Sequence, residues 1–383
     1  MNKILLSLDP YLFKNAADAG IPMTDGERGI KLAAVLGMFG NPRKGLQILD
    51  SVSKEHLKMA RELERFVHIQ IKSKWEKAVI YAEAKIEMKK DVWGRAIVQH
   101  EHDKIVLVES NKRCFFKGNA SERESTQKHM KAFKNLTIDD LIDYVANLPN
   151  EIKTIVERGI ELVKDISEEG LKKPLGIGVG HVLRENDSDT KTLVKARTAS
   201  AIDARMFGSS RPSIVVAGSG NQGIVATMPI YVYAKKNKMD EDLLTRSVAL
   251  SYLVTIYMSY HSSYLCAICG LGFKAGVGSS AGLAYYMSSG NKKVVKRAIQ
   301  NFIANLPGMI CDGGKYSCAL KGATASDAIY QSALLASKNK EPPYRNGILG
   351  KNVEDSIKNL GEIIKAAQPL NKIIVRILFD KQA

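Results

Sequence analysis

The sequence predicts an α+β fold, in which a predominantly α-helical main domain carries a small antiparallel β-subdomain. Three observations predict this class. Apolar residues recur at helical spacing from about residue 137 onward, apolar and polar residues alternate in short runs between residues 67 and 108, and no strand–helix alternation typical of a Rossmann sheet is present. A length of 383 residues and a hydrophobic content of 45% suffice for a large core.

Residues 1–63 are predicted to form a helical segment that packs on the main domain. Apolar residues recur at helical spacing between residues 30 and 36, and again between 56 and 63, after a break at Asn41-Pro42. The apolar run in residues 1–9 is too short for a signal peptide. We therefore expect a protein without a secretion signal that works in the cytoplasm.

Residues 64–118 are predicted to form the β-subdomain. Apolar and polar residues alternate around 67–71, 80–88 and 92–108, with short polar turns between the runs. Successive strands of this length are typical of an antiparallel sheet, and we expect a helix to cover its apolar face. The polar and charged stretch 119–135 that follows is interpreted as a linker.

Residues 136–383 are predicted to form the main helical domain. Thr137 is expected to be a helix N-cap, and Asp140, three residues later, completes a variant of the capping box. Apolar residues continue at helical spacing from 152 to 163, and from about 187 to 370 the chain reads as helices interrupted by glycine motifs. The sequence contains no internal repeat.

The stretch Ser247–Phe273 contains no formally charged residue and is long enough to span a bilayer. It also contains Thr255, His261, several serines and a glycine-rich end. These residues favour buried helices of a soluble protein, so we expect no membrane segment.

The net charge of +16 raises the question of an anionic partner, nucleic acid first of all. The lysines are spread through almost every segment, however, and no RNP-, KH- or zinc-finger-like pattern accompanies them. We therefore interpret the charge as a solvated lysine-rich surface and expect no nucleic-acid partner.

Four of the five cysteines lie in two pairs, Cys266 with Cys269 and Cys311 with Cys318. In a chain without a secretion signal, clustered cysteines indicate metal or iron–sulfur ligands before disulfides, and two separate loops can supply them together. Two alternatives stay open. The thiols can fill helix interfaces as small hydrophobic groups, or they can bind zinc, for which only the first pair has the usual spacing.

The glycine loop 218–223 runs directly into a predicted helix at 224–234. Backbone amides at a helix start bind anions, and Ser219, Asn221 and Gln222 add polar side chains, so the loop is predicted to cradle a carboxylate. It follows no convincing strand and lacks a Gly-Lys-Thr ending, which disfavours a dinucleotide or nucleotide site. A loop that only packs two helices together is the structural alternative.

Three motifs resemble signatures of one protein family and occur in its order. They are Asp203-Ala-Arg-Met-Phe-Gly208, Ala217-Gly-Ser-Gly-Asn-Gln-Gly-Ile-Val-Ala-Thr-Met-Pro229 and Gly308-Met-Ile-Cys-Asp-Gly-Gly-Lys-Tyr-Ser-Cys-Ala-Leu-Lys321. Together they resemble the serine dehydratase alpha-like family, in its cysteine desulfidase branch. The resemblance extends from about residue 13 to residue 338.

The resemblance implies a lyase that works without pyridoxal phosphate and uses a [4Fe–4S] cluster. Its reaction eliminates hydrogen sulfide from L-cysteine or water from L-serine, and the desulfidase-like form of residues 311–321 favours L-cysteine. Cys269 and Cys311 match the cluster cysteines of the family, and Cys318 matches a recurring cysteine. The expected partners are a small amino-acid substrate and, as a homodimer, a second copy of the chain.

One departure from the family concerns a third cluster cysteine, which lies near the N-terminus in a Gly-Cys-Thr-Glu-Pro segment. The present sequence begins after that point. Either the chain is shortened, or Cys318 or Cys266 supplies the missing ligand. Otherwise the cluster is lost, and the alternative function is that of a binding protein that keeps the fold without catalysis.

The resemblance assigns the glycine loop to the substrate, and side-chain chemistry suggests a role for Arg205. Ser219, Gly220, Asn221 and Gln222 are expected to bind the substrate, and Arg205 can hold its carboxylate in a bidentate fork. A structural pair between Asp203 and Arg205 is the alternative reading of that motif.

Two residues are candidates for the base that removes the Cα proton. His102 lies in a position similar to that of the family's H-T-N-I histidine, and Lys315 lies between two cysteines. Each has a structural alternative: His102 as a surface residue that shares a strand face with His100, and Lys315 as a surface lysine. His261, just before the cysteine pair, is either a supporting group of the site or a core histidine.

Overall fold

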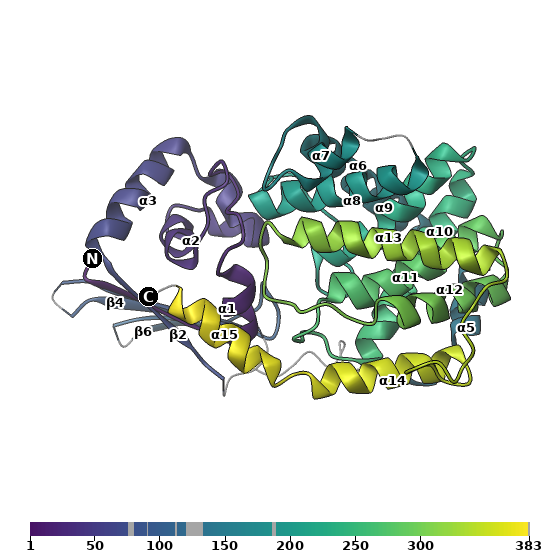
Figure 1. The fold of residues 1–383 in the computed structure, drawn as a ribbon. Helices are drawn as coiled ribbons and strands as arrows, with labels where there is room; N and C mark the ends of the chain where they lie inside the picture. Colours follow the sequence, from purple (N-terminus) through teal and green to yellow (C-terminus); the bar gives the residue numbers. More distant parts are fainter. Residues whose placement is uncertain (76–79, 90, 112, 120–132, 186–188, 382–383) are drawn as a thin grey trace. The chain divides into compact units, whose positions relative to one another are not determined.

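A computed structural model describes residues 1–381 apart from 76–79, 90, 112, 120–132 and 186–188, so most of the predicted linker lies outside the described residues. The chain divides into two compact units (Figure 1). Unit 1 comprises residues 1–127, 312–315 and 370–383, and unit 2 comprises residues 128–311 and 316–369. One unit contains a sheet and the other is helical, which confirms the predicted α+β fold class.

The sheet of unit 1 has six strands in the order β2-β1-β3-β4-β5-β6. Strands β3 to β6 are antiparallel to their neighbours, as predicted. The N-terminal strand β1 pairs in parallel with β2 and antiparallel with β3, so the sheet is mixed, and the sequence prediction did not include β1. The strands are β1 (Lys3–Leu8), β2 (His68–Ser73), β3 (Tyr81–Glu87), β4 (Trp93–Gln99), β5 (Ile105–Ser110) and β6 (Arg113–Lys117).

Helices cover one face of this sheet. Ile4, Leu6 and Leu8, which alternate along β1, share one core with apolar residues of the helices, among them Phe13 and Val375. Alternate residues point to opposite faces of a strand, and the other face carries both charged groups and a small apolar cluster that includes Tyr81 and Ile97. On that face Arg95 donates to Glu83 at 2.7 Å and to Glu109 at 3.0 Å. The helices of unit 1 are α1 (Pro10–Ala16), α2 (Ile30–Gly37), the 3₁₀ helix η1 (Pro42–Ser51), α3 (Lys54–Phe66) and α15 (Leu370–Asp380).

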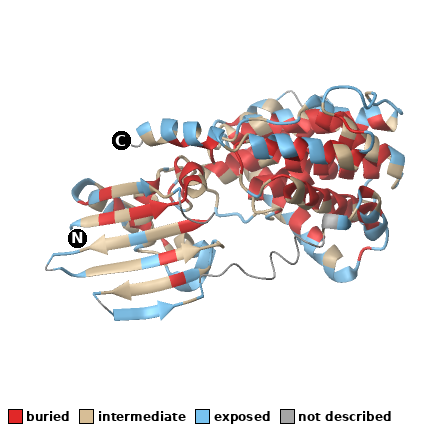
Figure 2. Cartoon of the chain, turned by 90° about the horizontal axis from the view of Figure 1, so that it is seen from below, coloured by how far each residue is buried: buried red, intermediate tan, exposed pale blue. Residues whose placement is uncertain are grey.

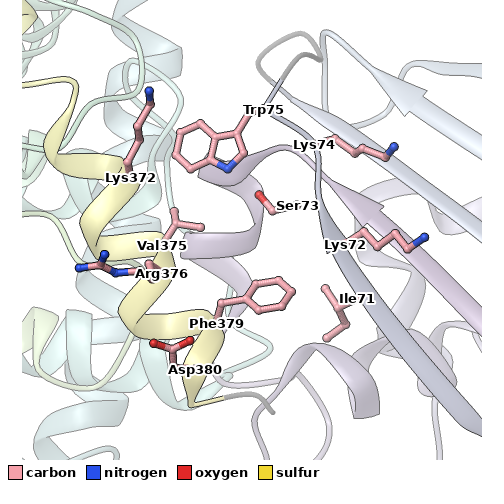
Figure 3. A pocket seen from close by; sticks show the side chains of 10 residues that line it. All are labelled: Ile71, Lys72, Ser73, Lys74, Trp75, Lys372, Val375, Arg376, Phe379 and Asp380. Carbon is pink, nitrogen blue, oxygen red and sulfur yellow. The ribbon is translucent and has the colours of Figure 1, made fainter.

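A cavity of about 650 Å³ opens between β2 and α15 within unit 1. Figure 3 shows Phe379 of α15 pointing toward Ile71 of β2, with Val375 one helical turn away. The rest of its lining consists of lysine, arginine, serine, tryptophan and aspartate side chains, and no residue predicted for the active site is part of it. The full lining is Ile71, Lys72, Ser73, Lys74, Trp75, Lys372, Val375, Arg376, Phe379 and Asp380.

Unit 2 is a helical bundle in which α11 lies among α9, α10, α12 and α13 (Figure 1). Figure 2 shows that most residues of this helical bundle are buried. Small residues make it possible: a Cβ on Gly276 would lie 2.1 Å from the Phe302 ring, and one on Gly278 would lie 2.4 Å from the carbonyl oxygen of Ser251. The small residues of the stretch Gly270–Gly282 therefore let neighbouring helices pack close to α11.

The helices of unit 2 begin and end as follows: η2 (Phe133–Asn135), α5 (Ile138–Ala146), α6 (Asn150–Lys172), α7 (Val179–Arg184), α8 (Thr190–Phe207), α9 (Gly220–Lys236), α10 (Glu241–His261), α11 (Gly270–Met287), α12 (Lys292–Asn305), α13 (Cys318–Ser337) and α14 (Val353–Ala366). The predicted capping box at Thr137 is confirmed, because Asp140 N donates to Thr137 Oγ1 at 3.2 Å and Thr137 N donates to Asp140 Oδ2 at 2.8 Å.

The uncharged stretch Ser247–Phe273 forms the later part of α10 and the start of α11, both largely buried. Over the residues whose structure is described, no helix combines the length and the apolar character needed to cross a membrane.

Asp203 is a buried carboxyl on α8 that lies at the start of α7. Its Oδ2 accepts from Gly180 N at 2.9 Å, and Gly176 and Gly178, both at positive φ, let the preceding loop turn around it. Burial raises the pKa of Asp203 to about 7, although the backbone N–H groups of residues 178–180 act in the opposite direction. The predicted alternative of an ion pair between Asp203 and Arg205 is wrong, because this carboxylate pairs with backbone.

The raised pKa of Asp203 predicts a pH-dependent stability with a definite sign. The unfolded chain releases this proton near pH 4 and the folded chain near pH 7. The free energy of unfolding therefore falls by roughly 2–4 kcal/mol as the pH rises from 4 to 7, and it changes little above pH 7. A D203N variant should lack this slope in thermal unfolding measured from pH 4 to 8. The matched control is D140N. The pKa of Asp140 is lowered in the folded chain, so this carboxylate contributes stability at neutral pH that is lost as the pH falls, which is the opposite sign.

Candidate active site

The α10–α11 loop and the α12–α13 loop bring two cysteines together. Cys269 N donates to Met309 O at 2.6 Å, and Cys311 N donates to Ala267 O at 2.7 Å, so the two loops form a short antiparallel bridge. The side chains of Cys269 and Cys311 are within hydrogen-bonding reach of each other. The structure thus places side by side the two cysteines that the sequence assigns to one site.

Cys318, the first residue of α13, lies near this pair. The hydrogen bond with Cys311 and burial raise the pKa of Cys269 well above its usual range, and the neighbouring Cys311 and Cys318 raise it further. Lys321, one turn along α13, acts in the opposite direction. A group of three thiols with a cation beside it is therefore present in unit 2.

Three helices begin at this group of thiols. Cys269 is the N-cap of α11 and Cys318 begins α13, and neither helix start has a side-chain cap. The third helix, α9, begins at Gly220, and its Gln222 amide lies over the Cα of Gly270. Helix N-termini carry partial positive charge and unpaired N–H groups, so these helix starts favour bound anions and act against the effect that burial and the neighbouring thiols have on Cys269.

The glycine loop before α9 is a tight turn with both central residues at positive φ, Ala217 at 47° and Gly218 at 80°. Ser219 then caps the helix, because its Oγ accepts from Gln222 N at 3.4 Å. The predicted loop does lead into a helix, but the helix begins at Gly220 and not at 224, so residues 220–223 of the predicted loop form its first turn. A non-glycine residue in the left-handed region stores strain of about 1–3 kcal/mol, which is common at ligand sites.

Arg205 of α8 reaches this loop. Its Nη1 donates to Asn221 Oδ1 at 3.1 Å, and a Cβ on Gly220 would lie 2.4 Å from its Nε, so only glycine lets the guanidinium lie against the start of α9. Burial lowers the pKa of Arg205, and the charge at Cys318 acts in the opposite direction. The guanidinium, the helix start and the third thiol are therefore neighbours.

Lys274 on α11 is a buried amine that the sequence analysis did not select. Its side chain is 1% exposed, and its Nζ donates to Ser263 O at 2.6 Å and to Tyr264 O at 3.0 Å. Burial lowers the pKa of Lys274 to about 8, and Cys266 and Cys311 act in the opposite direction. A sequence signal was present, because Lys274 is the one formally charged residue between Arg246 and Lys292.

Cys266 differs from the other three cysteines of its region. Its Sγ donates to Ile268 O at 2.9 Å, within its own loop. His261 ends α10 and is half-buried. Burial lowers its pKa to about 4, and its ring packs on Tyr257 with a centroid distance of 4.5 Å, while among the described residues its buried Nε2 has no hydrogen-bond partner.

The two candidate bases lie in unit 1. His102 is exposed and His100 half-buried in the turn between β4 and β5, so the prediction that both lie on a strand face is wrong. Lys315 forms an ion pair with Asp312 and donates to its carbonyl oxygen at 3.2 Å. The structure gives Lys315 and Asp312 to unit 1 although Cys311 belongs to unit 2.

Within the described part of the chain, no three His, Cys, Asp or Glu side chains are arranged to hold a metal ion. An iron–sulfur cluster makes a different demand, since each cysteine binds its own iron and the sulfurs need not converge on one point. Three thiols from two loops and a helix start, in a region of positive helix ends, match that donor chemistry. The residues present fit such a cluster.

The fold and the site define a protein whose group of cysteines adjoins a helix-start loop suited to a small carboxylate. The model of the family described as "Serine dehydratase alpha chain" matches residues 43–368. The chain belongs to this family, which confirms the family resemblance read from the motifs, and its family makes it an enzyme of the lyase type.

Individual relatives agree with this assignment. The chain is 37% identical to a UPF0597 protein of Clostridium botulinum over 371 residues, which are 95% of this chain and 86% of the relative. It is 36% identical to a protein of Methanocaldococcus jannaschii named L-cysteine desulfidase over 383 residues, which are 100% of this chain and 88% of the relative. A UPF0597 protein of Clostridium tetani is 36% identical, with 98% and 89% covered.

Proposed function

We propose that this chain eliminates hydrogen sulfide from L-cysteine and so forms pyruvate and ammonia. The observation that carries the proposal is the group of thiols Cys269, Cys311 and Cys318 next to the helix start at Gly220. The relative named L-cysteine desulfidase supports this substrate. L-Serine, which would lose water in the same reaction, is the second candidate, because the family is that of serine dehydratases.

The substrate carboxylate is proposed to bind at the start of α9. The backbone N–H groups of Gly220 and Asn221 lie in the first turn, where a helix provides no internal acceptor, and the Arg205 guanidinium lies against the same turn. An amino acid held there directs its β-substituent toward the thiols, because Gln222 of this turn lies over Gly270, which follows Cys269.

Cys269, Cys311 and Cys318 are proposed to hold a [4Fe–4S] cluster, which when bound supplies a Lewis-acidic iron for the leaving sulfide. Cys318 is favoured over Cys266 as the third ligand, since Cys318 is the neighbour of Cys269 while the Cys266 thiol donates to a carbonyl of its own loop. The positive charges of Lys321 and the helix starts offset the charge of the thiolates.

Elimination breaks the Cα–H and Cβ–S bonds. A base takes the Cα proton, for which His102 and Lys315 stay the proposed candidates, and the electron pair left on Cα forms the Cα–Cβ double bond as sulfide departs. The aminoacrylate formed tautomerises to an imine, and water hydrolyses the imine to pyruvate and ammonia. The proposed enzyme acts in the cytoplasm as a homodimer and has no nucleic-acid partner.

The test is iron and acid-labile sulfide content of anaerobically purified, reconstituted protein, together with pyruvate assays on L-cysteine and L-serine. About four iron and four sulfide per chain, the content of one [4Fe–4S] cluster, with pyruvate from L-cysteine, is the expected result. Pyruvate from L-serine alone would support the second candidate. Protein that binds no iron and forms no pyruvate would instead be a binding member of the family.

Replacement of Arg205 by methionine should raise KM for L-cysteine by about 10- to 100-fold and change kcat much less, because a charge-assisted hydrogen bond to the carboxylate is lost. R205K should recover part of the loss, since it keeps the charge without the planar fork. The matched control is R197M, on the same helix, where Arg197 pairs with Glu168 at 2.6 Å. Equal KM values in R205M and R197M would contradict the assigned role.

A further inference from the structure

Gln222 lies between the starts of two helices at the candidate active site. It is the third residue of α9 and is 5% exposed. Its side-chain amide covers the first residue of α11: a Cβ built on Gly270 would lie 3.0 Å from Gln222 Nε2 and 3.3 Å from Gln222 Oε1. The residue before Gly270 is Cys269, so this amide separates the glycine loop from the group of thiols.

One end of the Gln222 amide is engaged and the other is not. Nε2 donates to the carbonyl oxygen of Ala217 at 3.5 Å, which determines the orientation of the amide, because the reverse orientation would set two oxygens against each other. Within the described residues, Oε1 is buried and has no hydrogen-bond partner. Buried acceptors are rarely left unpaired in native proteins, and an unpaired one at a ligand site indicates a donor on the ligand.

The surroundings define which donor is missing. The region is rich in donors and positive charge, namely the starts of α9 and α11 and the Arg205 guanidinium. The other side-chain acceptors of the loop are used, since Asn221 Oδ1 accepts from Arg205 and Ser219 Oγ accepts from Gln222 N. A zwitterionic amino acid presents a carboxylate for the donors and an ammonium group that needs an acceptor, and Gln222 Oε1 is that acceptor.

We propose that Gln222 Oε1 accepts a hydrogen bond from the α-ammonium group of the substrate and thereby selects α-amino acids over acids that lack the amino group. The proposal rests on the carboxylate position of the proposed function. The substrate is then held at three points. Its carboxylate binds at the start of α9, its ammonium group binds at Gln222, and its β-substituent lies toward the thiols. Three such points also distinguish the L-enantiomer from the D-enantiomer.

The experiment measures equilibrium binding of L-alanine and propanoate, a pair that differs by the amino group and has no β-leaving group. Calorimetry on the reconstituted wild-type protein should show L-alanine binding about 10- to 100-fold more tightly, the effect of one hydrogen bond to a charged donor. In Q222M the ratio should fall at least tenfold, with propanoate affinity unchanged. In Q222E, which keeps an acceptor oxygen, the preference for L-alanine should persist.

The matched control is Q300M on α12, because Gln300 Oε1 is also buried without a partner among the described residues but belongs to another helix. Its ratio should equal that of the wild type. A wild-type protein without preference for L-alanine, or a Q222M variant with an unchanged ratio, overturns the proposal. If Q222M does not fold, loss of the preference in Q222E overturns it instead.

These outcomes are separate from those of the proposed function. If the protein forms pyruvate from L-cysteine but the ratio of its affinities for L-alanine and propanoate is the same in Q222M as in the wild type, the proposed lyase activity stands and this inference is wrong. If that affinity ratio falls in Q222M but the protein forms no pyruvate, this inference stands and the proposed lyase activity is wrong.

Discussion

A C311S variant is expected to lose both its bound iron and its lyase activity. Cys311 lies within hydrogen-bonding reach of Cys269 on a loop that backbone hydrogen bonds hold in place, so serine should change the ligand while leaving the loop intact. Hydroxyl oxygen is a poor substitute for thiolate on an iron–sulfur cluster. Iron content, visible absorbance and pyruvate formation should therefore fall together, by more than tenfold each in reconstituted protein.

The matched control for this loss is C114S. Cys114 lies on the exposed strand β6 of unit 1, and its replacement should leave iron content and activity at the wild-type level. C269S should behave like C311S. If C311S keeps its iron while pyruvate formation disappears, Cys311 acts on the reaction without binding the cluster, and the ligand assignment is wrong.

The same assay separates Cys318 from Cys266 as the third ligand. C318S should lose iron, because Cys318 is close enough to Cys269 to raise its pKa. C266S should keep it, because the Cys266 thiol donates to Ile268 O instead. The reverse result would give the third position to Cys266.

The parts of this fold that depend on local pattern were predictable from the sequence. Thr137 and Asp140 form the predicted capping box because both partners lie within four residues. The glycine loop leads into α9 as predicted, since Ser219 caps the helix that follows it. Short-range hydrogen bonds and side-chain periodicity carry this information, and both are read directly from neighbouring residues.

Long-range pairing was not predictable in this way. Strand β1 reads as a short apolar run, and its parallel partner β2 begins at His68, after four intervening helical segments. Nothing in either segment indicates the other. The turn at His102 was missed for a related reason: apolar alternation continues on both sides of it, and the chain reverses at residues 100–104.

The candidate site was predictable through its motifs, and its organisation was not. The segment from Cys311 to Cys318 reads as one continuous motif, yet residues 312–315 belong to unit 1 while both cysteines belong to unit 2. Lys274 was missed because a lysine in a glycine-rich helix reads as a surface residue until its burial is known. Membership of a unit and burial are properties of the packed chain.

Gly313, in the middle of that segment, is a position at which a single methyl group should lower stability strongly. It has a φ of 103°, and a Cβ there would lie 2.0 Å from the carbonyl oxygen of Lys14 on α1. Backbone strain at positive φ and overpacking against backbone each cost about 1–3 kcal/mol. G313A should therefore lower the free energy of unfolding by about 2–5 kcal/mol in chemical denaturation.

The consequence should extend to the thiols, because residues 312–315 are joined covalently to Cys311 and lead to Cys318. A segment displaced from Lys14 alters the spacing of these two cysteines, so iron content should fall in proportion to the displaced population. G29A is the matched control: Gly29 has a φ of 109° in the same unit, with no atom within 4 Å of its Cβ position. G29A should lose only the stability that corresponds to backbone strain, and it should keep its iron. If both variants lose stability and iron equally, the contact with Lys14 does not position the cysteines.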